Sequence, residues 1–207
     1  MYDNSRRDQA TRATRAAIVA AGHELFVELG YPGTTVARIA NRAGVGQATV
    51  YRLFGSKRNV LKEVLDIALG GDDQPIEVQQ RPEVRAAFES KTPEAMLEAF
   101  ARFLRLTLDR SGALQQVLLT SAAVDPEAAE MLAITRQQRH TGQSRIVEAL
   151  MAGGALRPGL SASEAADVVY TLMSPEVHRI LTTERGWNPD QYESWLAFAL
   201  RTQLLAQ

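Results

Sequence analysis

The chain has no cysteine, and this absence excludes disulfide bonds, thiolate catalysis and thiolate metal sites. Histidine is almost as scarce, with three residues in 207 and no pair at a spacing such as HExxH, so we expect no metal site. Apolar runs are short, and none approaches the ~20 residues needed to cross a bilayer. The N-terminus is polar and arginine-rich, without an apolar signal region. We therefore expect a cytoplasmic protein with no membrane contact.

Signatures of enzymes are also missing. The sequence contains no G-x-S-x-G elbow, no phosphate-binding loop and no dinucleotide fingerprint. Gly153 and Gly154 follow a helical pattern with no strand before it, which favours a turn over a phosphate site. The sequence predicts neither catalysis nor a cofactor. An enzyme stays open as an alternative class because acidic and hydroxyl side chains are plentiful.

Composition and charge divide the chain unevenly. With 45% hydrophobic residues over 207 positions, it can bury one substantial core and a small head domain. Its net charge is only −1, yet Met1–Lys62 holds ten basic and four acidic residues, against thirteen basic and twenty acidic in the remainder. A polyanion such as DNA would be attracted to the N-terminal part and repelled by the rest.

Residues 34–58 read TTVARIANRAGVGQATVYRLFGSKR, which is typical of a DNA-binding helix-turn-helix. Apolar residues recur every three or four positions on one face of the first helix, at Val36, Ile39, Ala40 and Ala43. Gly44 supplies the turn and Val45 fills it. The second helix buries its own apolar face, formed by Val50, Leu53 and Phe54. A plain helical hairpin is the alternative.

The flanking segments extend this pattern. An upstream helix carries one apolar stripe, made of Ile18, Ala21, Leu25, Phe26 and Leu29. We expect Gly30 to stop that helix, Thr35 to cap the next one and Ser56 to cap a fourth. A flexible leading arm is expected to follow the DNA backbone or a minor groove with Arg6, Arg7, Arg12 and Arg15.

The runs LFVELGYPGTTVARIANRAGV and ATVYRLFGSKRNVL resemble the TetR family of bacterial transcriptional regulators over roughly Arg12 to Asp72. Gly46 stands where this family usually has a capping Ser or Thr, and Arg58 where an acidic residue is frequent. The resemblance implies an all-α fold with a three-helix head, a connecting helix and a larger helical bundle. We expect the head at residues 12–72, with its helix-turn-helix motif at 35–54, and a regulatory and dimerisation domain at 82–207.

Base contacts are expected from the outer side of the second motif helix. Gln47, Thr49 and Arg52 are candidates for base edges, because Gln pairs with adenine and Arg with guanine. Ala48 is small enough to let the helix sit deep and to touch a thymine methyl. Arg52 has the alternative of being a solvated side chain.

Phosphate contacts are expected beside them. The resemblance assigns this role to the positions of Tyr51 and Lys57, and Thr35 can add its hydroxyl and the N-terminal amides of its helix. Tyr51 has an alternative, which is to pack under the fourth helix.

Beyond a break at residues 70–81, periodicity stays helical and no strand alternation appears. The expected helices cover 82–89, the segment from Thr92 to Thr107, a further stretch after Gly112, 125–152, 161–181 with a kink at Pro175, and the segment after Pro189.

The last helix, after Pro189, is apolar on more than one side, because Phe198 and Leu205 lie outside its main stripe. This favours pairing with a second copy of the chain. The resemblance also implies a homodimer, and hence a palindromic operator in double-stranded DNA. The expected interface comprises Val169, Met173, Val177, Ile180, Tyr192, Trp195, Phe198 and Leu200. An ordinary intrachain core is the alternative, as is a helical adaptor that binds another protein through Trp195 and Phe198.

A small apolar or amphipathic effector that releases a repressor from DNA is the remaining hypothesis. The resemblance places its pocket among the middle helices, at Phe100, Phe103, Leu104, Thr107, Leu118, His140, Ser144, Val147, Tyr170 and Met173. Each apolar residue among these could equally be plain core.

Overall fold

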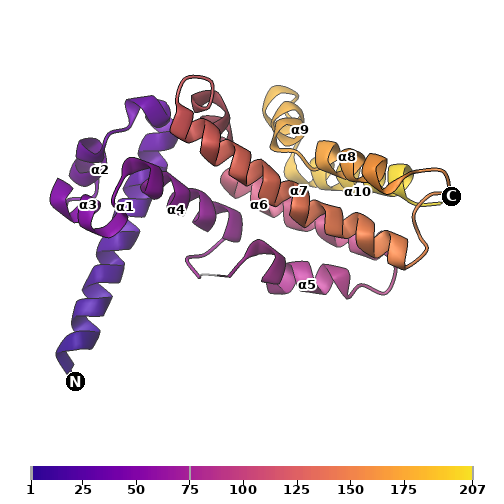
Figure 1. Cartoon of the computed structure of the whole chain (residues 1–207), viewed down its shortest axis with the longest axis horizontal. Coiled ribbons are helices and arrows are strands. Elements are labelled where there is room, and N and C mark those ends of the chain that lie inside the picture. The colour runs from indigo at the N-terminus through magenta and orange to yellow at the C-terminus, as the bar shows by residue number, and fades with distance from the viewer. Residues whose placement is uncertain (1, 75, 207) are drawn as a thin grey trace. The chain divides into compact units, whose positions relative to one another are not determined.

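The computed structural model describes residues 2–74 and 76–206, with side chains from residue 6 onward. Within these residues the regular elements are all helical, which confirms the all-α prediction (Figure 1). The α-helices are α1 (Tyr2–Gly33), α2 (Val36–Arg42), α3 (Gln47–Phe54), α4 (Lys57–Gly70), α5 (Pro82–Phe88), α6 (Pro93–Ser121), α7 (Pro126–Ala152), α8 (Ala162–Leu172), α9 (Pro175–Arg179) and α10 (Pro189–Leu204). A 3-10 turn covers Val78–Gln80 and a π-helical turn covers Ile180–Glu184. No helix in the described ranges has both the length and the apolar character for a membrane crossing.

The chain forms two compact units. The first contains the residues up to Ala68 together with Ala113–Leu132, and the second contains Leu69–Gly112 together with the residues from Ala133 onward. Two long helices, α6 and α7, therefore contribute to both units. The sequence instead predicts domains at residues 12–72 and 82–207, which would place both helices wholly in the second domain. This domain division stays a prediction.

The core of the first unit is built from the stripes that the sequence predicts. Buried residues of the four N-terminal helices include Ile18, Leu25, Phe26, Ile39, Val50, Phe54, Val60 and Leu61. Leu29 is the exception, since it is exposed. The ends of α6 and α7 complete this core with Leu114, Leu118, Ala128 and Met131.

The turns of the helix-turn-helix have the expected geometry. Gly30 has a φ of +68° and breaks α1 into two parts, and Gly44 has a φ of +67° between α2 and α3. Only glycine enters this left-handed region readily. Thr35 caps α2 by accepting a hydrogen bond from the backbone N–H of Arg38 at 3.2 Å.

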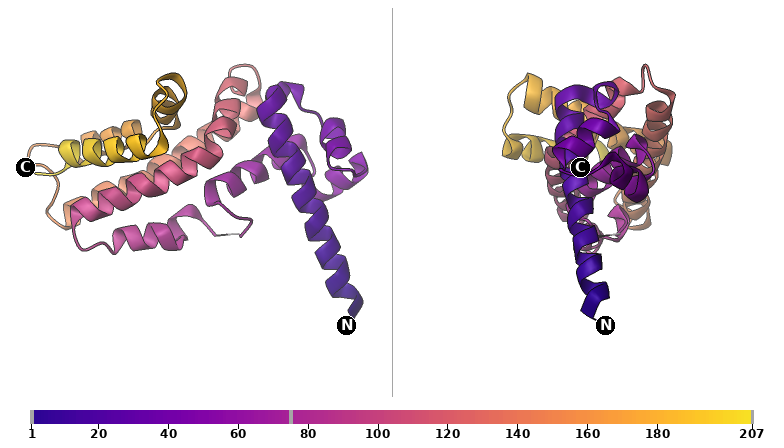
Figure 2. Two further views of the ribbon diagram at one scale, coloured as in Figure 1. Left: turned by 180° about the vertical axis from the view of Figure 1, so that it is seen from behind. Right: turned by 90° about the vertical axis from the view of Figure 1, so that its left-hand side faces the viewer.

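The N-terminal arm differs from the prediction of a flexible segment. The structure continues α1 as a helix back to Tyr2 (Figure 2). Among the described side chains of α1, the first buried one is Ile18. The side chains from Arg6 to Ala13 are all exposed. The arm is therefore a helix with solvent around it.

The second unit packs α5, α8 and α10 around parts of α6 and α7. Four α10 residues, Tyr192, Leu196, Leu200 and Leu204, are fully buried. α8 and α10 lie side by side in this core (Figure 1). An isolated backbone pairing joins Leu156 to Leu205 beyond α10.

Two predicted helix boundaries in this part of the chain are wrong. α6 runs through Gly112 as one helix, because a single glycine weakens a helix by only ~1 kcal/mol. The helix expected at 161–181 is broken at Ser174, next to the position of the predicted kink. Pro175 has no N–H to continue α8, and the Ser174 hydroxyl accepts a bond from the N–H of Val177 to start α9.

Candidate nucleic-acid interface

Helix α3 has one buried face and one exposed face. Val50 and Phe54 are buried against the core of the first unit. Gln47, Ala48 and Arg52 are exposed, and 53% of Tyr51 is accessible to solvent. The outward face therefore carries short, polar and cationic side chains, a composition that suits a major groove.

One alternative from the sequence can now be judged. Tyr51 does not pack under the fourth helix, because more than half of it is exposed. Thr49 is half-buried. Arg52 has no ion pair or side-chain hydrogen bond within the described part of the chain. Its guanidinium is available to a partner.

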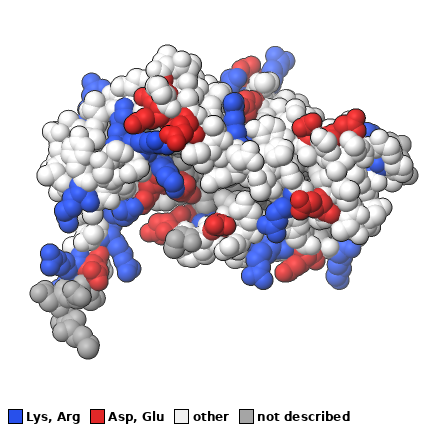
Figure 3. Space-filling model, viewed as in Figure 1, with Lys and Arg blue, Asp and Glu red and all other residues white. Residues whose placement is uncertain are grey.

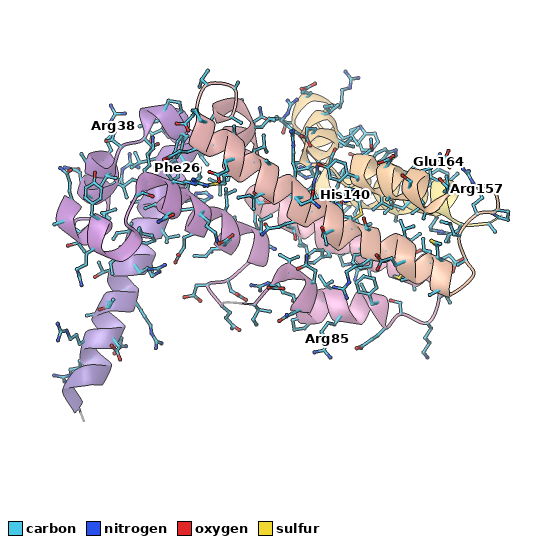
Figure 4. All side chains as sticks on the ribbon, in the orientation of Figure 1. Phe26, Arg38, Arg85, His140, Arg157 and Glu164 are labelled. Carbon is cyan, nitrogen blue, oxygen red and sulfur yellow. The ribbon has the colours of Figure 1, made fainter. Side chains whose placement is uncertain are left out.

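Helix α2 adds a basic residue that the sequence analysis missed. Arg38 is exposed one turn after Thr35, and its Nη1 donates to the carbonyl of Gly33 at 2.5 Å (Figure 4). Arg42, one turn further on, pairs with Glu24 at 2.8 Å and Glu28 at 3.2 Å and so ties α2 to α1. The sequence could have indicated Arg38, because it is a basic residue at an outward-facing position of the first motif helix.

Lys57 lies at the start of α4 and is half-buried. Its Nζ donates to the Tyr31 carbonyl at 2.8 Å and lies 3.8 Å from the centre of the Tyr31 ring. Burial lowers the pKa of Lys57, while the carboxylates of Asp125 and Glu127 oppose that shift. An ammonium group has three donors, and one of them is occupied here. Lys57 thus holds the first unit together, and its phosphate contact stays a prediction.

Arg15 is partly exposed and packs against α3 and α4 of the first unit, so its expected place in a free, DNA-contacting arm is wrong. Its Nε donates to Glu63 at 2.6 Å, and its Nη1 donates to the Leu53 carbonyl at 3.3 Å. The guanidinium also lies 4.5 Å from the centre of the Phe54 ring. These contacts join α1 to α3 and α4.

Positive charge in the first unit is exposed at the arm and on the motif. Arg6, Arg7 and Arg12 have exposed side chains with no ion pair within the described residues. Figure 3 shows basic side chains along the arm helix. Arg58, by contrast, pairs with Glu130 at 2.9 Å. The cations that remain available are those of the arm, Arg38 and Arg52.

The residues predicted to line an effector pocket are only partly gathered. Buried members in the core of the second unit are Phe100, Leu104, Thr107, Val147 and Met173, with Phe103 packed against them. Leu118 instead belongs to the core of the first unit.

The polar pocket candidates lie nearer the surface. The exposed ring of His140 lies 5.7 Å from that of Tyr170, which is half-buried. His140 is labelled on α7 in Figure 4. Ser144 is half-buried and donates its hydroxyl to the His140 carbonyl at 2.9 Å.

Half of the predicted dimer interface is interior. Four of its residues are buried within the single chain, so their side chains cannot meet a second copy: Val169, Met173, Tyr192 and Leu200. The apolar pattern of these residues correctly indicated that they are buried, but it did not indicate whether they pack on their own chain or on a second copy. Ile180 and Phe198 are exposed, Phe198 at 66%, and Val177 and Trp195 are half-buried.

Comparisons with known proteins match both the motif and the fold. Residues 18–64 match the model of the "Bacterial regulatory proteins, tetR family". The HTH-type transcriptional regulator YdeS of Bacillus subtilis is 28% identical over 172 residues, which cover 82% of this chain and 79% of YdeS.

Among solved structures, NalD of Pseudomonas aeruginosa superposes with a TM-score of 0.72 at 22% identity, covering 95% of this chain and 98% of NalD. NalD is described as the secondary repressor of the MexAB-OprM multidrug efflux pump. FadR of Bacillus subtilis, solved in complex with stearoyl-CoA, has a TM-score of 0.68 at 16% identity, covering 91% of this chain and 98% of FadR.

The family model covers the segment that holds the predicted motif, and the related chains and folds extend over most of both units. These relatives are regulators and not enzymes. Residues 18–64 therefore form a helix-turn-helix segment of the tetR type, and the chain is a DNA-binding transcriptional regulator.

Proposed function

We propose that this regulator is a homodimeric repressor that binds a palindromic operator and is released by a small apolar or amphipathic effector. The observation that carries the proposal is the exposed outer face of α3. On that face Gln47, Thr49 and Arg52 would read base edges and Ala48 would touch a thymine methyl. Phosphates would be held by Tyr51, Lys57 and Thr35.

The case for a homodimer rests on α10. Its inner face already supplies Tyr192, Leu196 and Leu200 to the core of the second unit. Phe198 lies outside that core with 66% exposure, and Trp195 is half-buried near it on the same helix. An exposed aromatic surface of this kind is most simply covered by the same surface of a second copy, which gives a two-fold dimer.

Repression and release by an effector are supported by the neighbours in structure and by the second unit. NalD is described as a repressor, and FadR was solved with stearoyl-CoA bound. The second unit has an extensive apolar core, with Phe100, Leu104 and Met173 inside it. An effector coupled to DNA binding by the usual ~1–3 kcal/mol would weaken operator binding roughly five- to 150-fold. A cytoplasmic location follows from the same proposal, since the operator is chromosomal.

The deciding experiment selects bound sequences from a random duplex pool with the purified full chain. We expect a palindrome whose half-sites are about one helical turn (~34 Å) apart, bound by a dimer whose affinity falls steeply as salt rises. An adaptor protein would ignore DNA, and a monomer that prefers no duplex over heparin would refute the proposal.

A further inference from the structure

Seven polar side-chain atoms of the second unit are buried without a hydrogen-bond partner among the described residues. Four belong to charged side chains, which are Arg81, Arg139, Glu176 and Arg179, and the other three belong to uncharged side chains. These three are Thr107 Oγ1 on α6, Gln143 Oε1 on α7 and the Tyr192 hydroxyl on α10. The exposed fractions of these residues are 5%, 8% and 0%. Buried polar atoms in proteins are nearly always paired, so these unpaired atoms need an explanation.

Thr107 differs from a close neighbour in the same helix. Ser111, one turn along α6 and also buried, donates its hydroxyl to the Thr107 carbonyl at 2.8 Å. This bond to the preceding turn is the usual solution for a hydroxyl inside a helix. The Thr107 hydroxyl does not make the equivalent bond, so its donor and its lone pairs remain available.

Gln143 and Tyr192 approach the junction of α8 and α9 from two other helices. The Gln143 amide donates from Nε2 to the Met173 carbonyl at 3.4 Å, which leaves Oε1 unpaired. The Tyr192 ring packs edge-on against His178 of α9, with the ring centres 4.8 Å apart. His178 in turn lies beside Gly112, within 3.8 Å of where a Cβ would be. Gln143 and Tyr192 therefore both reach residues of the α8–α9 junction beside α6, and Thr107 lies five residues before Gly112 on α6.

The charged side chains near this junction each make an ion pair or a ring contact, although Arg139 Nη1, Glu176 Oε2 and Arg179 Nε lack a hydrogen-bond partner. Asp109 contacts His178 at 3.2 Å and Arg105 at 3.5 Å, and Arg105 also donates to Glu193 at 3.1 Å. Burial lowers the pKa of His178, which favours the neutral ring. Thr107, Gln143 and Tyr192 supply two hydroxyls and one amide oxygen, none of which carries a formal charge. Together they offer two donors and at least three acceptor positions.

We propose that Thr107, Gln143 and Tyr192 form the polar end of the effector site, and that the effector carries an uncharged hydroxyl or carboxamide on an apolar body. A hydroxyl or a carboxamide can both donate and accept hydrogen bonds. It could therefore donate to the Gln143 oxygen and accept from the hydroxyls of Thr107 and Tyr192. The apolar body would lie among Phe100, Leu104, Val147 and Met173 of the same core. This inference rests on the proposed effector response and specifies the ligand class, which differs from the anionic stearoyl-CoA of FadR.

The first test compares probes that share one tail and differ in the head group. 1-Decanol, decanamide, decanoate and decyltrimethylammonium are titrated into the full-length protein, and the midpoint of thermal unfolding and the dissociation constant are measured. We expect the alcohol and the amide to stabilise the protein and to bind at least tenfold more tightly than the two ions. Tighter binding of decanoate would overturn the proposal and would point to Arg139 as the ligand's partner. The Arg139 Nη1 is also buried and unpaired, and its guanidinium lies 4.0 Å from the centre of the Tyr170 ring. Equal binding of all four probes, or binding of none, would also overturn it.

The second test removes the polar atoms without changing the packing. Thr107→Val, Gln143→Met and Tyr192→Phe should each weaken binding of the alcohol or the amide about threefold to tenfold, as expected for the removal of one hydrogen bond. Their unfolding midpoints should hold or rise, because each change removes an unsatisfied atom. Ser111→Ala is the matched control, since that hydroxyl is satisfied within α6, and it should leave probe affinity unchanged. Unchanged affinity in all three variants would show that the atoms are only structural.

DNA binding of the same preparations separates this inference from the proposed function. A wild-type protein that binds its operator but has no preference among the probes refutes only the ligand class. If the wild-type protein prefers the uncharged probes and the three variants do not, the binding site is established, even if the probes do not release the protein from DNA. In that case the proposed effector response is wrong and the binding site stands.

Discussion

At the scale of single residues, two arginines of the basic N-terminal segment have opposite surroundings. Arg15 donates to Glu63 and to the Leu53 carbonyl, and it stacks over Phe54. Arg52 lies on the outer face of α3 with no partner within the described residues. Sequence composition assigns both the same charge, whereas only Arg52 has that charge available for DNA.

Arg52→Ala should weaken operator binding by ~1–3 kcal/mol and relax the base preference at one position in each half-site. The reason is the loss of a bidentate contact to one guanine. Binding to the selected operator and to single-base variants measures both effects. Arg85→Ala, an exposed arginine of α5, is the control and should change neither (Figure 4). A uniform loss on all sequences would make Arg52 a phosphate contact.

Tyr31 gives a prediction for alkaline pH. Its burial, reinforced by the carboxylates of Asp125 and Glu127, raises the pKa of Tyr31 to about 12 from 10.0. Because the unfolded state loses this proton first, the stabilisation is complete below pH 10 and is lost as the pH rises towards 12. With each pKa unit worth about 1.4 kcal/mol, the wild type should lose roughly 2 kcal/mol more than Tyr31→Phe across this range.

Urea unfolding of the two proteins at pH 9 and pH 12 tests this expectation. The variant serves as the reference because it keeps every other titrating group, including Lys57. Equal losses of unfolding free energy in the two proteins would mean that Tyr31 ionises at its ordinary pKa.

At the scale of elements, the helices begin and end where local chemistry requires it. Thr35 and Ser174 cap α2 and α9 with their hydroxyls, and Pro175 prevents α8 from continuing. The arm of α1 is the contrasting case, because it is helical without an apolar face against the core. An element that stabilises no core is better explained by what it can contact outside the chain.

The arm should contribute to DNA affinity without contributing to stability. In the triple variant Arg6→Gln, Arg7→Gln and Arg12→Gln, the unfolding midpoint should stay unchanged, since these side chains have no ion pair within the described residues. Affinity should fall for all sequences alike, and the slope of log K against log salt should decrease by about 0.9 for each phosphate that the variant no longer neutralises.

Arg15→Gln is the control for the arm and should show the reverse pattern, with a lower unfolding midpoint because it removes the bonds to Glu63 and Leu53. A triple variant with an unchanged salt slope would place the arm away from DNA.

At the scale of the whole molecule, function depends on what two copies do together. A single recognition helix reads only a few base pairs, so a specific operator needs two heads at a fixed separation. The exposed Phe198 side of α10 is the surface that we expect to provide this pairing. Dimerisation and DNA affinity should therefore change together.

Phe198→Glu should convert the dimer to a monomer and weaken operator binding at least tenfold, because a carboxylate would be desolvated at the interface. Light scattering gives the mass, and gel shifts give the affinity. Val124→Glu is the matched control, as Val124 is 76% exposed on the turn after α6. A dimeric Phe198→Glu protein would place the interface elsewhere.

Local patterns were sufficient for much of this molecule. The four N-terminal helices, the turn at Gly44, the cap at Thr35 and the outward side of α3 all follow from residues within one or two turns of each other. A periodicity of 3.6 residues fixes which side of a helix is buried, and a glycine or a capping hydroxyl fixes where it ends. The sequence by itself therefore determined the helix-turn-helix and its exposed face.

Only the tertiary structure decided which partner each buried face meets. It placed Leu118 in the core of the first unit, Tyr192 and Leu200 in the chain's own interior, and Lys57 against the Tyr31 carbonyl. These contacts join residues far apart in the sequence, and an apolar stripe has the same pattern whether it packs on its own chain or on a second copy. The unpaired atoms of Thr107, Gln143 and Tyr192 are the clearest case, because hydrogen-bond satisfaction depends on what the fold brings within about 3 Å of each atom.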